Sequence, residues 1–143
     1  LREIIGLPAG ASGLLVTGGS MANLVGLTVA RSAKADFDVR KEGLQCGSSC
    51  MTVYASAETH SCVKKGVELL GMGSQALHSI PVNDQFQIDL EALAAAVKAD
   101  RADGKQPIMV VGNAGTVNTG ASLTDPMLTV TVACLVVTPS VTL

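Results

Sequence analysis

The sequence predicts an α/β fold built on a mostly parallel sheet with flanking helices. Short runs rich in β-branched and apolar residues alternate with longer runs that carry apolar residues at helical spacing. Glycine, proline or an N-capping residue stands at several of the junctions and separates the elements. Residues 107–111 form an unbroken apolar run, which is typical of a strand buried on both faces of a parallel sheet. This alternation favours right-handed strand–helix–strand units.

The first part of the chain is expected to form a strand, a tight turn and a helix. Residues 13–17 are apolar and lead into two glycines. Ser20 is a good N-cap for a helix that runs to about residue 34. The polar, glycine-containing residues 34–49 indicate a surface loop.

Two further units and a last strand complete the predicted fold. The second helix presents Val63, Val67 and Leu70 on one face, and the third begins at Asp89 as its N-cap and ends at Gly104. The four expected strands are residues 13–17, 51–56, 75–82 and 107–111.

Composition restricts the class of protein. Of the 143 residues, 48% are hydrophobic but only 2% are aromatic, so the core must consist mainly of aliphatic side chains. A net charge of −2 gives no electrostatic reason to expect nucleic acid or an anionic membrane as a partner. There is no apolar run near the roughly 18 residues of a membrane span, and the first residues lack the layout of a signal peptide. We therefore expect a cytoplasmic protein.

The four cysteines do not form a recognisable framework. Cys46 and Cys50 make a CxxxC pair, but neither His60 nor His78 is spaced as the second half of a zinc site. We expect no metal and free thiols in a reducing compartment. His78 lies inside a predicted strand and is interpreted as structural.

The glycine turn, in the stretch of residues 17–23, is the first candidate site. Gly18 and Gly19 allow backbone conformations closed to other residues, and the free N–H groups of the next helical turn suit an anion, above all a phosphate. Glycine turns between strand and helix are common, however. A turn that binds nothing remains an equal alternative.

Two more polar segments follow predicted strands. His60 comes after residues 51–56, and the loop of residues 112–120, which contains Thr116 and Asn118, comes after residues 107–111. In parallel sheets ligands gather at the carboxyl ends of the strands, so these segments and the glycine turn are expected to meet at one edge. His60 could lie flat against a planar cofactor, or it could simply cap the next helix. Thr116 and Asn118 could likewise only shape a turn.

These motifs resemble those of the pyridoxal-phosphate-dependent amino acid decarboxylases related to aromatic-L-amino-acid and glutamate decarboxylase. The resemblance extends in order from residue 1 to about residue 126. It is carried by residues 13–23 (GLLVTGGSMAN), 57–61 (AETHS), 80–82 (IPV) and 110–121 (VVGNAGTVNTGA).

The resemblance implies part of an aspartate-aminotransferase-type (fold type I) large domain, with pyridoxal 5′-phosphate (PLP) as cofactor, an amino acid as substrate and a homodimer as the assembly. Gly19 and Ser20 would hold the cofactor phosphate, and His60 would stack on the pyridine ring. Thr116, with Asn118, would lie beside the ring edge. Val117 stands where family members often have a second threonine, so no hydroxyl contact is expected from that position.

The catalytic pair of the family is missing from this sequence. PLP enzymes use a lysine for the Schiff base and an acid that keeps the pyridine nitrogen protonated. After Asp125 the sequence has no Asp, Glu, Lys or His. We therefore expect residues 1–126 to be the N-terminal part of the PLP-binding large domain, and residues 127–143 a divergent, β-prone tail produced by truncation or a lost reading frame.

The expected function is thus that of a decarboxylase fragment, a piece of a carboxy-lyase, that is inactive alone. The alternative is a non-catalytic α/β module that binds PLP or another phosphorylated ligand. A nucleotide-binding domain is less favoured, because Gly18 and Gly19 do not form a GxGxxG motif. We also expect part of the tail, within residues 128–138, to add a strand to a sheet that lacks its later strands.

Overall fold

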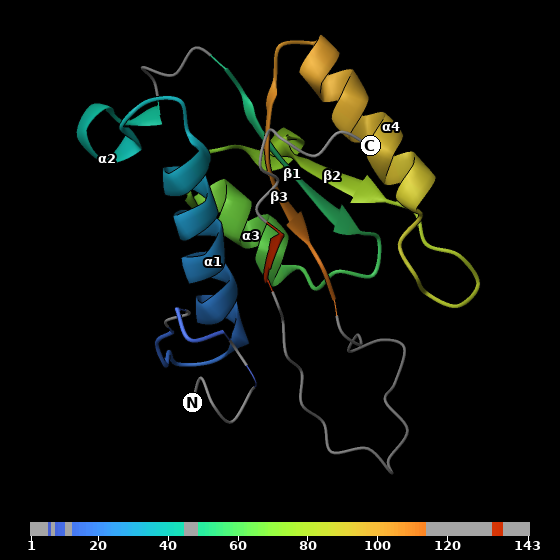
Figure 1. Ribbon diagram of the computed structural model, residues 1–143, viewed down its shortest axis with the longest axis horizontal. Coiled ribbons are helices and arrows are strands. Elements are labelled where there is room, and N and C mark those ends of the chain that lie inside the picture. Colours follow the sequence, from blue (N-terminus) through green and yellow to red (C-terminus); the bar gives the residue numbers. More distant parts are fainter. Residues whose placement is uncertain (1–5, 7, 11–12, 45–48, 114–132, 136–143) are drawn as a thin grey trace.

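The structure, a computed structural model, describes residues 6, 8–10, 13–44, 49–113 and 133–135, the last three by their backbone. Helices and strands alternate along most of this part (Figure 1), which confirms the α/β prediction. The elements are α1 (Gly19–Lys34), α2 (Val39–Glu42), β1 (Met51–Ser56), α3 (Cys62–Leu69), the 3-10 helix η2 (Ser74–Ala76), β2 (Leu77–Ile80), α4 (Leu90–Ala102), β3 (Gln106–Val111) and β4 (Ala133–Leu135).

The sheet has the strand order β2-β1-β3-β4. Its first three strands are parallel, with Val53 of β1 opposite Leu77 of β2 on one side and Met109 of β3 on the other. The short β4 pairs antiparallel with β3 at Val110 and Val111. Three residues of the β-prone tail therefore join the sheet, as expected.

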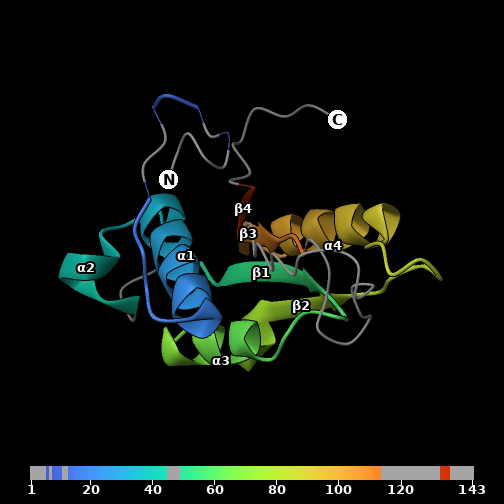
Figure 2. The same ribbon diagram turned by 90° about the horizontal axis from the view of Figure 1, so that it is seen from below.

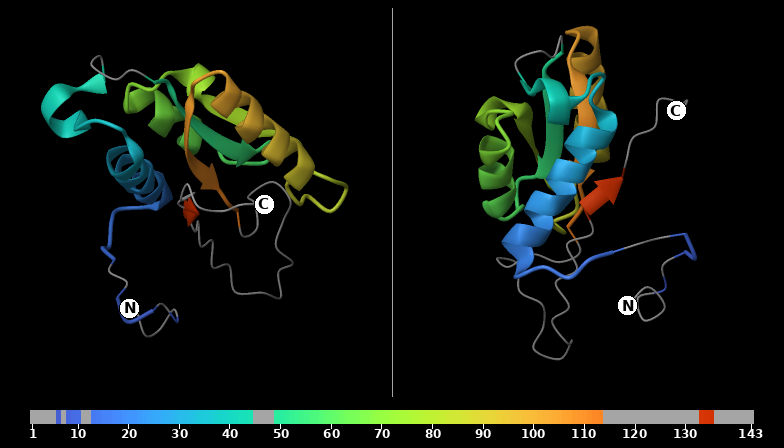
Figure 3. Two further views of the ribbon diagram at one scale, coloured as in Figure 1. Left: turned by 45° about the horizontal axis from the view of Figure 1, so that its top comes forward. Right: turned by 90° about the vertical axis from the view of Figure 1, so that its left-hand side faces the viewer.

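Helices cover both faces of the sheet. Figure 2 shows α3 and α4 on opposite sides of β1 and β2, and Figure 3 shows α1 lying beside the sheet. The apolar core lies between the sheet and the pair α1 and α3. It includes Leu27, Val53, Val63, Val67 and Ile108, each at most 2% exposed.

The expected first strand is wrong. Residues 13–17 form no strand, and Leu14 and Leu15 are 67% and 81% exposed. A strand needs a neighbour to bond its backbone N–H and C=O groups, and within the described residues this segment has none. The apolar run therefore leads into α1 as an irregular segment.

The helix boundaries agree more closely with the sequence. Asp89 caps α4, because its carboxylate accepts hydrogen bonds from the N–H groups of Glu91 and Ala92 at 2.9 and 3.0 Å. In its described residues, the expected surface loop contains the short helix α2, which Asp38 caps in the same way. Within the described part of the chain, every helix is too short or too polar to cross a membrane.

Candidate functional site

The glycine turn lies at the start of α1. Gly18 is the N-cap, its φ of 85° is in the region that favours glycine, and its N–H donates to the Val16 carbonyl at 3.1 Å. Ser20 is therefore not the N-cap, as the sequence suggested, but the second residue of the helix. Among the residues that the structure describes, no side chain caps this end of α1. The first-turn N–H groups of Gly19 and Ser20 consequently have no acceptor within the helix.

The turn leaves space for a ligand. A Cβ atom placed on Gly18 or Gly19 would meet no other atom within 4 Å, and both residues are exposed. Exposed N–H groups at the positive end of a 16-residue helix suit a phosphate. The segment is thus open and offers N–H donors of the kind that bind an anion.

The start of α1 is fixed beside the start of α3. Asn23, only 6% exposed, donates from Nδ2 to the Cys62 Sγ at 3.0 Å. Further along, the two helices approach closely at Gly66, where a Cβ would lie 2.7 Å from the Leu27 Cδ1. The segment that carries His60 therefore lies next to the helix that begins at the glycine turn.

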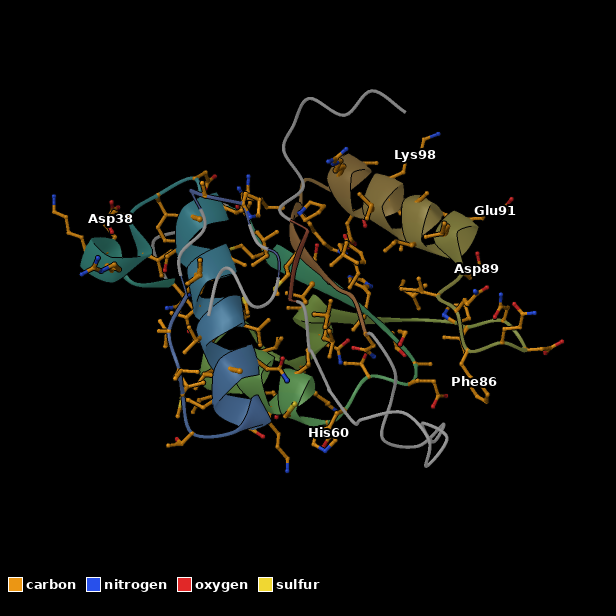
Figure 4. All side chains as sticks on the ribbon, turned by 60° about the horizontal axis from the view of Figure 1, so that its bottom comes forward. Asp38, His60, Phe86, Asp89, Glu91 and Lys98 are labelled. Carbon is orange, nitrogen blue, oxygen red and sulfur yellow. The ribbon has the colours of Figure 1, made fainter. Side chains whose placement is uncertain are left out.

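His60 lies just before α3 and is exposed, as Figure 4 shows at the edge of the molecule. Its Nδ1 accepts a hydrogen bond from the Cys62 N–H at 3.1 Å. The ring thus caps α3 locally, which was the alternative weighed from the sequence. A neutral ring that accepts at Nδ1 carries its proton on Nε2, so His60 presents an N–H donor and a flat face.

A third polar group at this edge comes from the end of β3. Asn113 donates from Nδ2 to the Thr59 Oγ1 at 2.8 Å and lies 3.4 Å from the Ser56 Oγ. The sequence placed the loop after β3 at this edge but did not single out Asn113 or Thr59, because nothing local pairs residues 54 positions apart. Thr116 and Asn118, predicted to border the cofactor, lie outside the described residues.

A separate set of polar side chains lies away from this edge. We call it the Asp100 cluster, and it consists of Thr52, Tyr54, His78, Asp100 and Lys105. Asp100 is 3% exposed and accepts hydrogen bonds from the Tyr54 hydroxyl at 2.6 Å and the Lys105 Nζ at 2.9 Å. The His78 Nε2 lies 2.9 Å from the same carboxylate, and its ring stacks on Tyr54. His78 thus lies inside β2, as the sequence indicated, and packs against Tyr54 and Asp100.

The cluster shifts three pKa values, and the hydrogen bond to Asp100 raises that of Lys105. Burial, together with the hydrogen bond to Asp100, raises the pKa of Tyr54 well above its ordinary 10.0. Burial acts to raise the pKa of Asp100 as well, but the hydrogen bonds from Tyr54 and Lys105 and the nearby His78 hold it below its ordinary value. Lys105 also lines a pocket of about 490 Å³ at the amino ends of the strands, the opposite end from His60.

Taken together, the fold and this edge define an α/β domain with a glycine turn and an exposed imidazole at the carboxyl ends of parallel strands. Residues 1–135 match the pyridoxal-dependent decarboxylase conserved domain. The chain belongs to the pyridoxal-dependent decarboxylase family.

Individual relatives agree with this assignment. The chain is 40% identical over 121 residues to an aromatic-L-amino-acid decarboxylase of Bacillus atrophaeus, covering 85% of this chain and 23% of the relative. It is 32% identical over 132 residues to an L-2,4-diaminobutyrate decarboxylase of Acinetobacter baumannii, covering 85% and 26%. The chain thus spans about a quarter of the length of these relatives.

Solved structures share the fold. The glutamate decarboxylase domain of a Vibrio parahaemolyticus diaminobutyrate-pyruvate transaminase and L-2,4-diaminobutyrate decarboxylase matches with a TM-score of 0.72 and 26% identity, over 80% of this chain and 26% of that one. Oryza sativa TDC, solved with PLP and tryptamine, matches with a TM-score of 0.67 and 28% identity, over 80% and 25%.

Proposed function

We propose that this chain holds the phosphate and the pyridine ring of PLP in an amino acid decarboxylase, and that the 143 residues alone do not decarboxylate. The observation that carries the proposal is the contact of Asn23 with Cys62. It fixes a glycine turn, whose first-turn N–H groups have no acceptor among the described residues, next to the segment that bears an exposed imidazole. The family to which the chain belongs supports the cofactor.

Each candidate residue has a defined task in this proposal. Gly19 and Ser20 bind the phosphate through N–H groups and the serine hydroxyl, and the ring of His60 lies against the pyridine ring. Thr116 and Asn118 border the ring. Bound PLP supplies an electron sink that lets the carboxylate of an amino acid leave as carbon dioxide.

The sequence supports the absence of turnover by the chain alone. A lysine for the Schiff base must reach the carboxyl edge of the sheet. Lys105 instead donates to Asp100 before β3, and Lys64 and Lys65 are exposed on α3. After Asp125 the sequence holds no acid that could pair with the pyridine nitrogen.

Calorimetric titration with pyridoxine 5′-phosphate tests the holding role, because its alcohol cannot react with lysines as the PLP aldehyde does. We expect saturable binding that weakens when the phosphate is removed and in His60→Ala. His60→Phe keeps a flat ring and is expected to bind more tightly than His60→Ala. No binding would refute the proposal. Binding that needs the phosphate but not the ring at position 60 would favour the alternative, a non-catalytic module that binds a phosphorylated ligand.

Reaction with PLP tests the second half of the proposal. After borohydride reduction and peptide mapping, we expect no single lysine to be modified stoichiometrically. Mixtures of the chain, PLP and an L-amino acid are expected to release no amine. A stoichiometric adduct at one lysine, or steady amine release, would contradict the assignment.

The wider proposal covers the substrate and the setting of the parent enzyme. We propose an L-amino acid as substrate, a second copy of the subunit as partner and the cytoplasm as location. Analytical ultracentrifugation and fractionation of cells that express the tagged chain test the last two.

A further inference from the structure

Two asparagine side chains from different elements hold the segment that carries His60. On one side, Asn113 at the end of β3 donates to the Thr59 Oγ1 at 2.8 Å. On the other side, Asn23 of α1 donates to the Cys62 Sγ at 3.0 Å. His60 stands between these two fixed points, one residue after the first and two before the second.

The Asn113 side is the more extensive of the two. The Asn113 Nδ2 also lies 3.4 Å from the Ser56 Oγ, and the Ser56 and Thr59 hydroxyls are 3.3 Å apart. The Thr59 N–H donates to the Ser56 carbonyl at 3.0 Å, which closes the turn between β1 and His60. We call Ser56, Thr59 and Asn113 the asparagine clamp.

We propose that the asparagine clamp is a positioning device for His60, with Asn113 and its acceptor Thr59 as the positioning residues. The clamp ties the turn after β1 to the end of β3, so the backbone just before His60 cannot move independently of the sheet. At the other end, the Cys62 N–H donates to the His60 Nδ1 at 3.1 Å and fixes the plane of the ring. With both ends held, the imidazole keeps one tautomer and one ring plane.

This inference rests on the proposed function, because a fixed His60 ring affects cofactor affinity only when the planar cofactor lies against it. An ordered ring does not have to give up rotational freedom when the cofactor binds, and this raises affinity without a new contact. Neither Asn113 nor Thr59 needs to touch the cofactor. Their loss is expected to weaken binding of the ring portion rather than of the phosphate.

The sharpest test compares Thr59→Val with Thr59→Ser. Valine keeps the shape of threonine without the hydroxyl, whereas serine keeps the hydroxyl. We expect Thr59→Val to bind pyridoxine 5′-phosphate about five-fold more weakly than the unmodified chain, the loss typical of one neutral hydrogen bond. Thr59→Ser is expected to bind like the unmodified chain, and Asn113→Ala like Thr59→Val. Equal affinity of the valine and serine variants would overturn the proposal.

A second measurement needs no ligand. The chain has two histidines, so long-range ¹H–¹⁵N spectra of the imidazoles report His60 with His78 as an internal reference. We expect a single Nδ1-acceptor tautomer for His60 in the unmodified chain and in Thr59→Ser, and averaged nitrogen shifts in Thr59→Val and Asn113→Ala. The His78 shifts should stay constant in all four proteins.

The two measurements separate this inference from the function on which it rests. If pyridoxine 5′-phosphate fails to bind the unmodified chain, the proposed function is refuted, and the imidazole spectra still decide whether the clamp orders His60. If the ligand binds but the His60 spectra are the same in all variants, the clamp is refuted and the function stands. Circular dichroism of each variant confirms that it is folded.

Discussion

Replacing Asp100 by alanine tests how α4 is held to the sheet. The carboxylate is buried on α4 and accepts a hydrogen bond from the hydroxyl of Tyr54, a fully buried residue of β1, at 2.6 Å. Asp100→Ala removes this acceptor and leaves the hydroxyl only Thr52, 2.9 Å away. Both groups are buried, so the Tyr54 hydroxyl loses its charged acceptor inside the fold.

The magnitude follows mainly from that one bond. A hydrogen bond to a charged group contributes about 1.5–3 kcal/mol, more than a neutral one. The Lys105 side chain is 37% exposed, so water can replace Asp100 for its ammonium group, and its share is small. The buried His78 Nε2 lies 2.9 Å from the carboxylate without a hydrogen bond to it. We expect Asp100→Ala to lower the free energy of unfolding by about 2–3 kcal/mol, a large part of the roughly 5–15 kcal/mol of an ordinary domain.

Urea denaturation followed by circular dichroism measures this loss. With a slope of about 2 kcal/mol per molar urea, the midpoint should fall by about 1–1.5 M. Asp103→Ala is the matched control, because Asp103 also lies near Lys105, at 3.6 Å, but its side chain is 66% exposed. We expect less than about 0.5 kcal/mol from the control. A loss below about 1 kcal/mol for Asp100→Ala, or equal losses for both variants, would show that the reasoning is wrong.

Three further predictions concern stability. The folded state lowers the pKa of Asp100, so its contribution to the free energy of unfolding is full above the ordinary pKa of 3.8. This contribution is lost as pH falls through the lower pKa of the folded state. Asp100→Ala should therefore flatten the pH dependence of stability in urea melts between about pH 5 and 2. Gly18→Ala should lower the free energy of unfolding by about 1 kcal/mol, because Gly18 has a φ of 85°. Gly19 lies in open space without a positive φ, so Gly19→Ala should leave stability nearly unchanged in thermal melts. Equal effects of the two substitutions would argue against the turn described. Asp89→Ala should cost about 1 kcal/mol by removing the cap of α4, and Asp89→Ser should recover most of it; an unchanged urea midpoint in Asp89→Ala would contradict the capping role.

The sequence was sufficient to predict the features that depend on residues close together in the chain. Apolar spacing located α3 with Val63 and Val67 in the core, and the Asp89 cap was read directly from its position before an apolar run. The family motifs followed from residues adjacent in the chain. Such signals are local because helical periodicity and capping act within a few residues.

Tertiary structure decided whatever depends on distant partners. Residues 13–17 look like a strand, but within the described part no neighbouring strand bonds their backbone, and they stay irregular. Ser20 looks like an N-cap, yet the positive φ of Gly18 starts the helix earlier. Asn113 contacts Thr59 across 54 positions, and Tyr54 contacts Asp100 across 46. Spacing along the chain does not encode such contacts, because they arise only when the parallel strands pair and bring their ends and covering helices together.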